Sequence, residues 1–262
     1  MFLDIDGNKF FALSFGKGHQ TFLAHSGWIG NFEDWIAALG PLSANWRAVI
    51  YDHRGAGETQ VSLDAITPEA LVDDVFAVMD ALSINRCVIG GFSKGTETVL
   101  RAVIKHPERF EGMVLMSGCG EILPPDAPRR PAVAPSNWPG ETFSDHLNWF
   151  AEMCLPEPDS GHIRRWGINI LSRSTPEVAD RIFTMQHSEP VDWPTRLGEL
   201  DIPTLLIHGD RDAFYDVERM KYAQSLIPRS ELVVLEGTGH LPAMTRPDEV
   251  AGAIDRFFAG SN

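Results

Sequence analysis

Short apolar runs alternate along this chain with longer segments in which apolar residues recur every three or four positions. The runs at 21–24, 46–51 and 113–116 predict buried strands. The segment 67–82 opens with Thr-Pro-Glu, a favourable helix start, and its apolar residues follow helical spacing. Further strands are predicted at 203–208 and 231–235, and further helices at 32–39, 216–226 and 247–258. This alternation predicts an α/β fold in which helices cover both faces of a mostly parallel sheet.

Two regions depart from this alternation. At the amino end, apolar runs at 2–5 and 9–13 flank an Asp-Gly turn signal and predict a hairpin. The stretch 119–194 starts with six prolines between Pro124 and Pro139. Amphipathic helices are then predicted at 142–154, 161–172 and 176–187. A helical insertion between strands, on the side where ligands bind, predicts a cap. We therefore expect a core of 1–118 and 195–262 and a cap of 119–194.

Composition narrows the class of protein. A chain of 262 residues with 44% apolar residues fits one large globular domain, with or without an insertion. The net charge of −14 argues against nucleic acid and anionic membranes as partners. No apolar run approaches a membrane span, and acids stand where a secretion signal would carry lysines. Three widely separated cysteines indicate free thiols in a reducing compartment and no zinc spacing. We expect a cytoplasmic protein with no metal and no cofactor.

The most specific chemistry lies in Gly91-Phe92-Ser93-Lys94-Gly95. This G-x-S-x-G segment follows an apolar run that begins at Cys87 and precedes a helix predicted at 96–104. Between a strand and a helix the pattern is typical of a nucleophile elbow, in which the serine takes a positive φ and crowds its neighbours. Small residues are therefore needed two positions before and after it. The turn also aims the first amides of the helix at an oxygen beside the serine. Ser93 is the predicted nucleophile.

A serine hydroxyl needs a base to remove its proton and a third group to hold that base. The strand predicted near 204–207 leads into Asp210 and Asp212, and the strand at 232–235 leads into His240. Serine, acid and histidine in this order are expected after a nucleophile elbow. All three follow strands, so one edge of the sheet would gather them.

With these segments the chain resembles the α/β-hydrolase family over nearly all of its length outside the expected cap. The matching segments are His25-Ser26-Gly27-Trp28, Asp52-His53-Arg54-Gly55-Ala56-Gly57, Gly91-Phe92-Ser93-Lys94-Gly95, Gly209-Asp210-Arg211-Asp212 and Gly239-His240. The resemblance implies Ser93 as nucleophile and His240 as general base and then acid. It favours Asp212 over Asp210 as the orienting carboxylate, because the second acid of Gly-Asp-x-Asp usually faces the histidine in this family.

The resemblance also implies an oxyanion hole made of two backbone amides. One is the amide of Lys94, directly after the nucleophile. The other belongs to the loop after the third strand, where this chain departs from the family's usual His-Gly pattern. That departure leaves Gly27 and Trp28 as candidates, and we favour Trp28. Lys94 is unusual at its position, and we expect its side chain to pair with Glu97 rather than to attract a substrate carboxylate.

The function implied is hydrolysis of a small-molecule ester or related acyl compound by a serine enzyme. A carboxylate nucleophile would be needed for a haloalkane dehalogenase or an epoxide hydrolase, and Ser93 argues against both. A lactonase, a carbon–carbon hydrolase and a cofactor-free perhydrolase use the same triad and remain alternatives. A different class is a ligand sensor that retains a slow hydrolase pocket. Steady multiple turnover would distinguish the enzyme from the sensor.

Overall fold

A single sheet organises the described residues, which are 1–127 and 132–259 of the computed structural model. Its strand order is β1-β2-β4-β3-β5-β6-β7-β8. The first two strands form the predicted hairpin, β2 pairs antiparallel with β4, and all later pairs are parallel. The predicted mostly parallel sheet is confirmed. The strands are β1 (Phe2–Ile5), β2 (Asn8–Phe15), β3 (Gln20–His25), β4 (Trp46–Tyr51), β5 (Cys87–Phe92), β6 (Phe110–Met116), β7 (Thr204–Gly209) and β8 (Ser230–Leu235).

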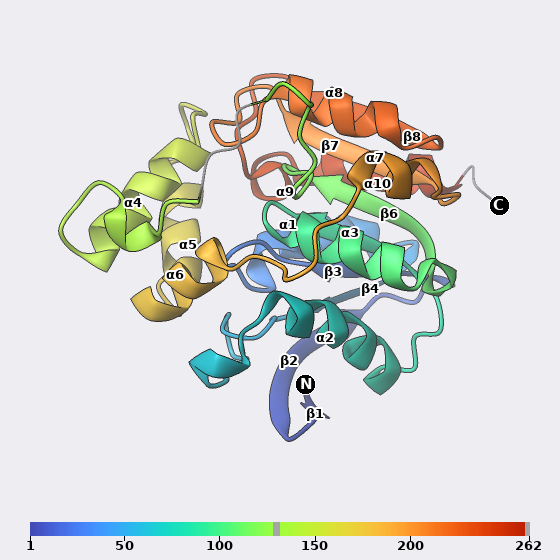
Figure 1. Cartoon of the computed structure of the whole chain (residues 1–262), viewed down its shortest axis with the longest axis horizontal. Helices are drawn as coiled ribbons and strands as arrows, with labels where there is room; N and C mark the ends of the chain where they lie inside the picture. Colours follow the sequence, from blue (N-terminus) through green and yellow to red (C-terminus); the bar gives the residue numbers. More distant parts are fainter. Residues whose placement is uncertain (128–131, 260–262) are drawn as a thin grey trace.

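Helices cover both faces of this sheet (Figure 1). On one face α1 (Glu33–Leu42) packs against α10 (Pro247–Ala259). On the other lie α2 (Pro68–Ala81), α3 (Gly95–Lys105) and α8 (Val217–Leu226). Strand β5 is buried along its whole length between these layers, which is why it reads in the sequence as an uninterrupted apolar run. The remaining short helices are α7 (Trp193–Gly198), α9 (Pro242–Thr245) and the single 3₁₀ turns Leu63–Ala65, Pro107–Arg109 and Pro135–Asn137.

Three helices between β6 and β7 stand apart from the sheet (Figure 1). They are α4 (Phe143–Cys154), α5 (Gly161–Leu171) and α6 (Pro176–Thr184), and together we call them the helical segment. All three predicted helices are confirmed, although α6 ends three residues before the predicted boundary at 187. In the described parts of 119–194 there is no strand. Two of the six prolines, at 128 and 131, lie outside the described residues. Helix α7 crosses position 194, where the expected cap ends.

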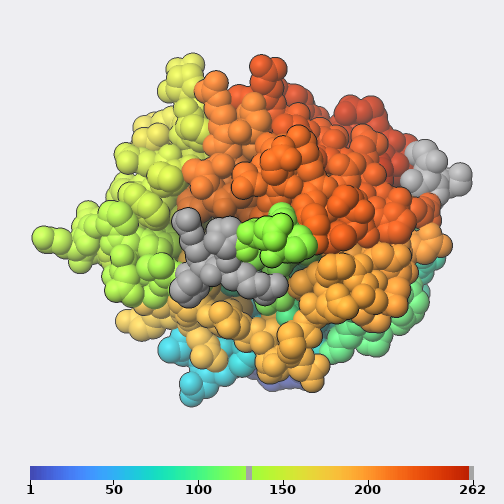
Figure 2. Space-filling view, turned by 45° about the horizontal axis from the view of Figure 1, so that its top comes forward, coloured from blue at the N-terminus to red at the C-terminus, as the bar shows by residue number. Residues whose placement is uncertain are grey.

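Aromatic side chains attach the helical segment to the rest of the molecule. The Trp28 ring, from the loop after β3, lies 5.1 Å from the Trp138 ring and 4.9 Å from the Phe150 ring between centroids. Trp138 stacks on Phe150 at 5.3 Å with an interplanar angle of 11°. The indole N–H of Trp28 donates to the carbonyl of Ala179 in α6 at 2.9 Å. In Figure 2 the yellow-green atoms of α4 lie against the orange atoms of the carboxyl-terminal third, to which Phe214 belongs, and the Phe150 and Phe214 rings are 5.0 Å apart between centroids.

The three cysteines are buried and free, as the spacing predicted. Burial raises the pKa of each thiol, that of Cys119 to about 11, so all three stay protonated near neutral pH. None of the described helices combines the length and the apolar character needed to cross a membrane. The described residues also contain no cluster of three or more side chains arranged to hold a metal ion.

Candidate active site

Ser93 sits on a strained turn between β5 and α3. Its φ is +51°, in the left-handed region that costs a residue with a side chain about 1–3 kcal/mol. Neighbouring groups hold it there: its amide donates to Met116 O at 2.8 Å, at the end of β6. The Thr96 amide and hydroxyl both donate to Ser93 O, at 3.0 and 2.6 Å. The Thr96 hydroxyl also accepts from Gly120 N at 3.0 Å, so it ties the elbow to the loop after β6.

The two flanking glycines are required for different reasons. A Cβ on Gly91 would lie 2.9 Å from the Cα of Thr96 and 3.0 Å from Gly95 O, which is the crowding across the turn that the motif predicts. A Cβ on Gly95 would lie 2.3 Å from Ser26 O. The space at Gly95 is therefore taken by the loop after β3, and this glycine lets that loop approach the elbow.

The structure brings Ser93, His240 and Asp212 into one line of hydrogen bonds. Nε2 of His240 lies 2.8 Å from Oγ of Ser93, and Nδ1 lies 2.7 Å from Oδ2 of Asp212. Each residue follows a parallel strand (β5, β7 and β8), and the carboxyl ends of these strands meet at one edge of the sheet. His240 and Asp212 are almost completely buried. A carboxylate that holds Nδ1–H leaves the lone pair of Nε2 directed at the serine hydroxyl.

The two acids of the loop after β7 have different surroundings. The other carboxylate oxygen of Asp212 accepts from the amides of Phe214 and Tyr215, at 2.8 and 3.2 Å. Burial raises the pKa of Asp212, but attraction to His240 and these hydrogen bonds outweigh burial, and the pKa lies below its usual value. Asp212 is therefore ionised near neutral pH. Asp210 instead accepts from the amide of Gly237 at 2.7 Å and braces the loop after β8.

Two contacts, from the end of α4 and from the turn that follows it, hold the histidine loop. The amide of His240 donates to Cys154 O at the end of α4, at 2.8 Å. The amide of Gly239 donates to Oε1 of Glu157, also at 2.8 Å. We call these two contacts the latch. A Cβ on Gly239 would lie 2.3 Å from Cδ of Pro156, so glycine is needed for the loop to come this close. The sequence carries no signal for the latch, because its partners are more than 80 positions apart.

Two pockets meet at Ser93 and His240. The first, which we call the apolar pocket, has an empty volume of about 480 Å³ and lies between the sheet edge and helices α4 and α5. The second, the polar pocket, has about 1260 Å³ and extends past Lys94 toward charged side chains. Trp28 and Phe150 line both pockets. The apolar pocket is also lined by Phe92, Cys154, Leu171, Leu241 and Met244, and the polar pocket by Glu97, Glu121, Gln186 and Arg219.

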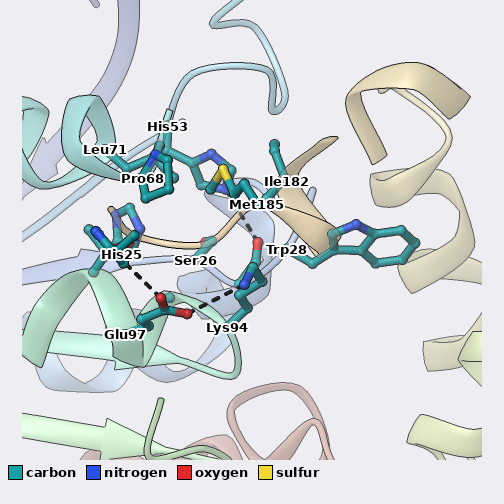
Figure 3. Close-up of a pocket in the computed structure, with 14 residues that line it drawn as sticks. His25, Ser26, Trp28, His53, Pro68, Leu71, Lys94, Glu97, Ile182 and Met185 are labelled. Carbon is teal, nitrogen blue, oxygen red and sulfur yellow. Dashed lines mark hydrogen bonds and ion pairs between the residues drawn. The ribbon is translucent and has the colours of Figure 1, made fainter. Parts of the chain in front are cut away.

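Lys94 faces a third, smaller pocket beside the elbow (Figure 3). Its ammonium lies 3.4 Å from Glu97, so the predicted ion pair is confirmed. Glu97 also lies 3.4 Å from Nε2 of His187. Burial, together with the positive charge of Arg101, lowers the pKa of His187 to about 4, so this imidazole is neutral near pH 7. Trp28 points away from this pocket, toward the helical segment (Figure 3).

The remaining histidines near the site make structural contacts. His25, for which we expect a structural role, hydrogen-bonds the hydroxyl of Tyr51 through Nδ1 at 2.8 Å. Nε2 of His53 lies 3.3 Å from Gly27 O and supports the loop after β3. His208 is fully buried at the end of β7 and donates from Nε2 to Tyr215 O at 2.9 Å. Burial lowers the pKa of all three, which keeps them neutral.

Comparison with known proteins places the chain in a family. A family model described as the alpha/beta hydrolase fold matches residues 20–153. The chain belongs to the alpha/beta hydrolase fold family. It is 24% identical over 230 residues to 3-oxoadipate enol-lactonase 1 of Acinetobacter baylyi, covering 85% of this chain and 82% of the relative. It is also 24% identical over 260 residues to the pimeloyl-[acyl-carrier protein] methyl ester esterase of Aeromonas hydrophila, covering 93% and 96%.

Solved structures agree on the fold. A bromoperoxidase from Bacillus anthracis superposes with a TM-score of 0.83 at 21% identity, covering 99% of each chain. An enol-lactonase from Burkholderia xenovorans also gives a TM-score of 0.83, at 17% identity, covering 99% of this chain and all of the other. The names of these proteins span several chemistries, so the shared fold leaves the reaction to be argued from the site.

Proposed function

We propose that this protein is a serine hydrolase that cleaves a small-molecule carboxylic ester through an acyl-enzyme on Ser93. One observation carries the proposal: the continuous line of 2.8 and 2.7 Å contacts from Ser93 Oγ through His240 to a buried, ionised Asp212. A serine at an elbow with this line of partners is equipped for nucleophilic attack on a carbonyl carbon.

The proposed reaction has two halves. Oγ of Ser93 attacks the ester carbonyl while Nε2 of His240 takes the hydroxyl proton, and Asp212 stabilises the imidazolium that forms. His240 then returns the proton to the leaving alkoxide, and an alcohol departs. In the second half His240 takes a proton from water, the water attacks the acyl-enzyme, and the carboxylic acid leaves with Ser93 restored.

We assign the developing oxyanion to the amides of Lys94 and Trp28, with Gly27 as the alternative to Trp28. Support for this comes from Gly27, Trp28 and Ser93 lining the same apolar pocket, and from the position of Lys94 at the amino end of α3. The two pockets on either side of Ser93 suit the two parts of an ester.

We further propose that residues 119–194 act as a cap over this site. Phe150 and Cys154 of α4 line the pocket that contains Ser93, and the latch joins the same helix to the histidine loop. Covering the site in this way would limit the access of water to the acyl-enzyme. The three free cysteines support a cytoplasmic location.

A lactonase is the second candidate, favoured by the enol-lactonase among the full-length relatives. It uses the same residues, but both products of the cleavage remain in one molecule. The experiment is a panel of activated esters, lactones and thioesters, assayed for alcohol or thiol release and for ring opening. We expect steady turnover by the wild type and a loss of about 10⁵-fold or more in Ser93→Ala. Full turnover by Ser93→Ala would refute the proposal, and one slow turnover by the wild type would favour a ligand sensor.

A further inference from the structure

A carboxyl group lines the apolar pocket, and the proposed mechanism does not use it. Asp34 lies in the first turn of α1 and shares this pocket with Ser93 and His240. Its exposed fraction is only 7%. A Cβ on Gly30 would lie 1.8 Å from Oδ2 of Asp34, so the backbone there must be glycine for the carboxyl group to occupy this position. The carboxyl group thus lines a pocket of mostly apolar side chains, which it shares with the proposed nucleophile.

The surroundings of Asp34 disfavour a negative charge. In the described part of the chain no Lys, Arg or His lies within ion-pair distance of it. Burial raises its pKa most, the nearby acids Asp52 and Glu33 raise it further, and the Ser26 hydroxyl offsets this only in part, so the pKa reaches about 8. That hydroxyl has a single hydrogen, which lies on the 2.7 Å contact to Asn31 O, so toward a protonated Asp34 its oxygen is an acceptor. At neutral pH Asp34 is a carboxylic acid with an O–H to donate.

A neutral acid in an apolar pocket needs a hydrogen-bond acceptor, and the Ser26 oxygen is the acceptor that a substrate oxygen would replace. A substrate that fills the pocket with apolar atoms makes no use of this O–H, whereas a substrate oxygen that accepts its proton gains a buried hydrogen bond. The thiol of Cys154, in the same pocket, is protonated and is a weak acceptor. A site built around such a donor discriminates strongly against analogues that lack the acceptor.

We propose that Asp34 donates a hydrogen bond to a keto or ether oxygen on the acyl chain of the substrate. The apolar pocket then holds the acyl chain, and the preferred esters are those of oxo or alkoxy acids rather than plain fatty acids. This inference rests on the proposed function, since it assumes that Ser93 forms an acyl-enzyme. It assigns Asp34 as a specificity-determining residue with no part in proton transfer to the leaving group.

The test compares methyl hexanoate with its 3-, 4- and 5-oxo analogues in a pH-stat assay. For wild type at pH 7 we expect the best oxo ester to exceed methyl hexanoate about 10–100-fold in kcat/KM, the discrimination that one buried hydrogen bond provides. In Asp34→Leu, which removes the donor at similar volume, that ratio should fall to about 1. In Asp34→Asn, which keeps an N–H donor, the ratio should persist. Asp248→Asn, at an exposed acid in the first turn of α10 and outside the pocket, is the matched control and should keep the wild-type ratio.

Ionisation supplies a second readout that does not depend on the leucine variant folding. The wild-type ratio should decline from pH 7 to pH 9 as Asp34 ionises, while the ratio of Asp34→Asn stays level. The other groups near Asp34 that titrate are Asp52, Glu33, Cys154 and His240, and all of them remain in the asparagine variant.

Several outcomes would overturn the inference. These are an unchanged ratio in Asp34→Leu, no preference of the wild type for any oxo position, or the same pH dependence in Asp34→Asn. A preference that appears only when the keto group is moved to the alcohol half would also overturn it. An enzyme that hydrolyses none of these esters, or a Ser93→Ala variant that hydrolyses all of them, would instead refute the proposed function.

Discussion

The carboxyl edge of the sheet and the helical segment line the same pockets, but they do so with different kinds of contact. The sheet edge contributes Ser93, Asp212 and His240, which are held by backbone hydrogen bonds and by each other. The helical segment contributes mostly aromatic and aliphatic side chains. A rigid edge suits chemistry that depends on distances of tenths of an ångström, whereas an apolar covering suits selection of a substrate by shape. The latch is the point at which the helical segment reaches the loop that carries His240.

The largest expected effect lies on the sheet edge. Asp212→Asn should lower kcat about 10⁴-fold, because an amide neither fixes the His240 tautomer nor stabilises the imidazolium. Asp210→Asn, in the same loop, should stay within about tenfold of wild type, because Asp210 contacts only the loop backbone. Steady-state kinetics on one activated ester measures both variants. Equal losses in the two would contradict the assignment of Asp212.

The next prediction tests whether the latch positions His240, the proposed general base. Glu157→Ala removes the acceptor for Gly239 and should lower kcat about 10²-fold with little change in KM, because a shift of about 1 Å in the histidine loop is enough to do so. Glu157→Gln keeps an acceptor and should recover most of this loss. Glu152→Ala, on the exposed side of α4, serves as the control. If Glu157→Ala changed only KM, the latch would have no role in positioning His240.

The proposal that the helical segment covers the site predicts a smaller effect, on substrate binding. Phe150 lines both pockets and stacks on Trp138. Phe150→Ala should raise KM for long-chain esters about tenfold, the cost of losing part of a buried aromatic contact, and should change kcat much less. Acetate esters, which are too short to reach the ring, should show a smaller change. A loss confined to kcat would place Phe150 in the positioning of the catalytic residues.

The last expected effect is on stability rather than on turnover, and it depends on pH. Because the pKa of Asp34 is raised to about 8 in the fold, the unfolded chain binds fewer protons than the folded chain between about pH 4 and pH 8. The stability of wild type relative to Asp34→Asn should therefore decrease across that window and level off above it. About four pKa units correspond to about 5–6 kcal/mol, so we expect the difference in Tm to reach about 10 °C near pH 8. Calorimetry of both proteins from pH 4 to pH 9 measures it, and a constant difference would contradict the raised pKa.

Local sequence patterns predicted the sheet and the elbow well, but they did not predict contacts between residues that are far apart in the sequence. The run from Cys87 into Ser93 carries its whole signal within a few residues, and the loops that follow β7 and β8 place Asp212 and His240 at one edge of the sheet. The prediction that position 95 needs a small residue is confirmed. The space there is taken by the carbonyl of Ser26, nearly 70 positions earlier in the chain. In the sequence Asp34 is one of two acids in the first turn of a predicted helix, where acids are favoured whatever their function, so nothing there indicated its place in a pocket. Glu157 had no local signal, because its contact with Gly239 exists only once the chain has folded.

The latch also limits how this protein can be re-engineered. Exchanging residues 119–194 for the equivalent region of another enzyme is an obvious way to change substrate range. Here a replacement would also have to provide a carbonyl for the amide of His240, a carboxylate for that of Gly239, and a residue that packs against Gly239 as closely as Pro156 does. Grafts that begin after Glu157 and leave Cys154 and Pro156 in place should therefore retain turnover more often than exchanges of the whole region.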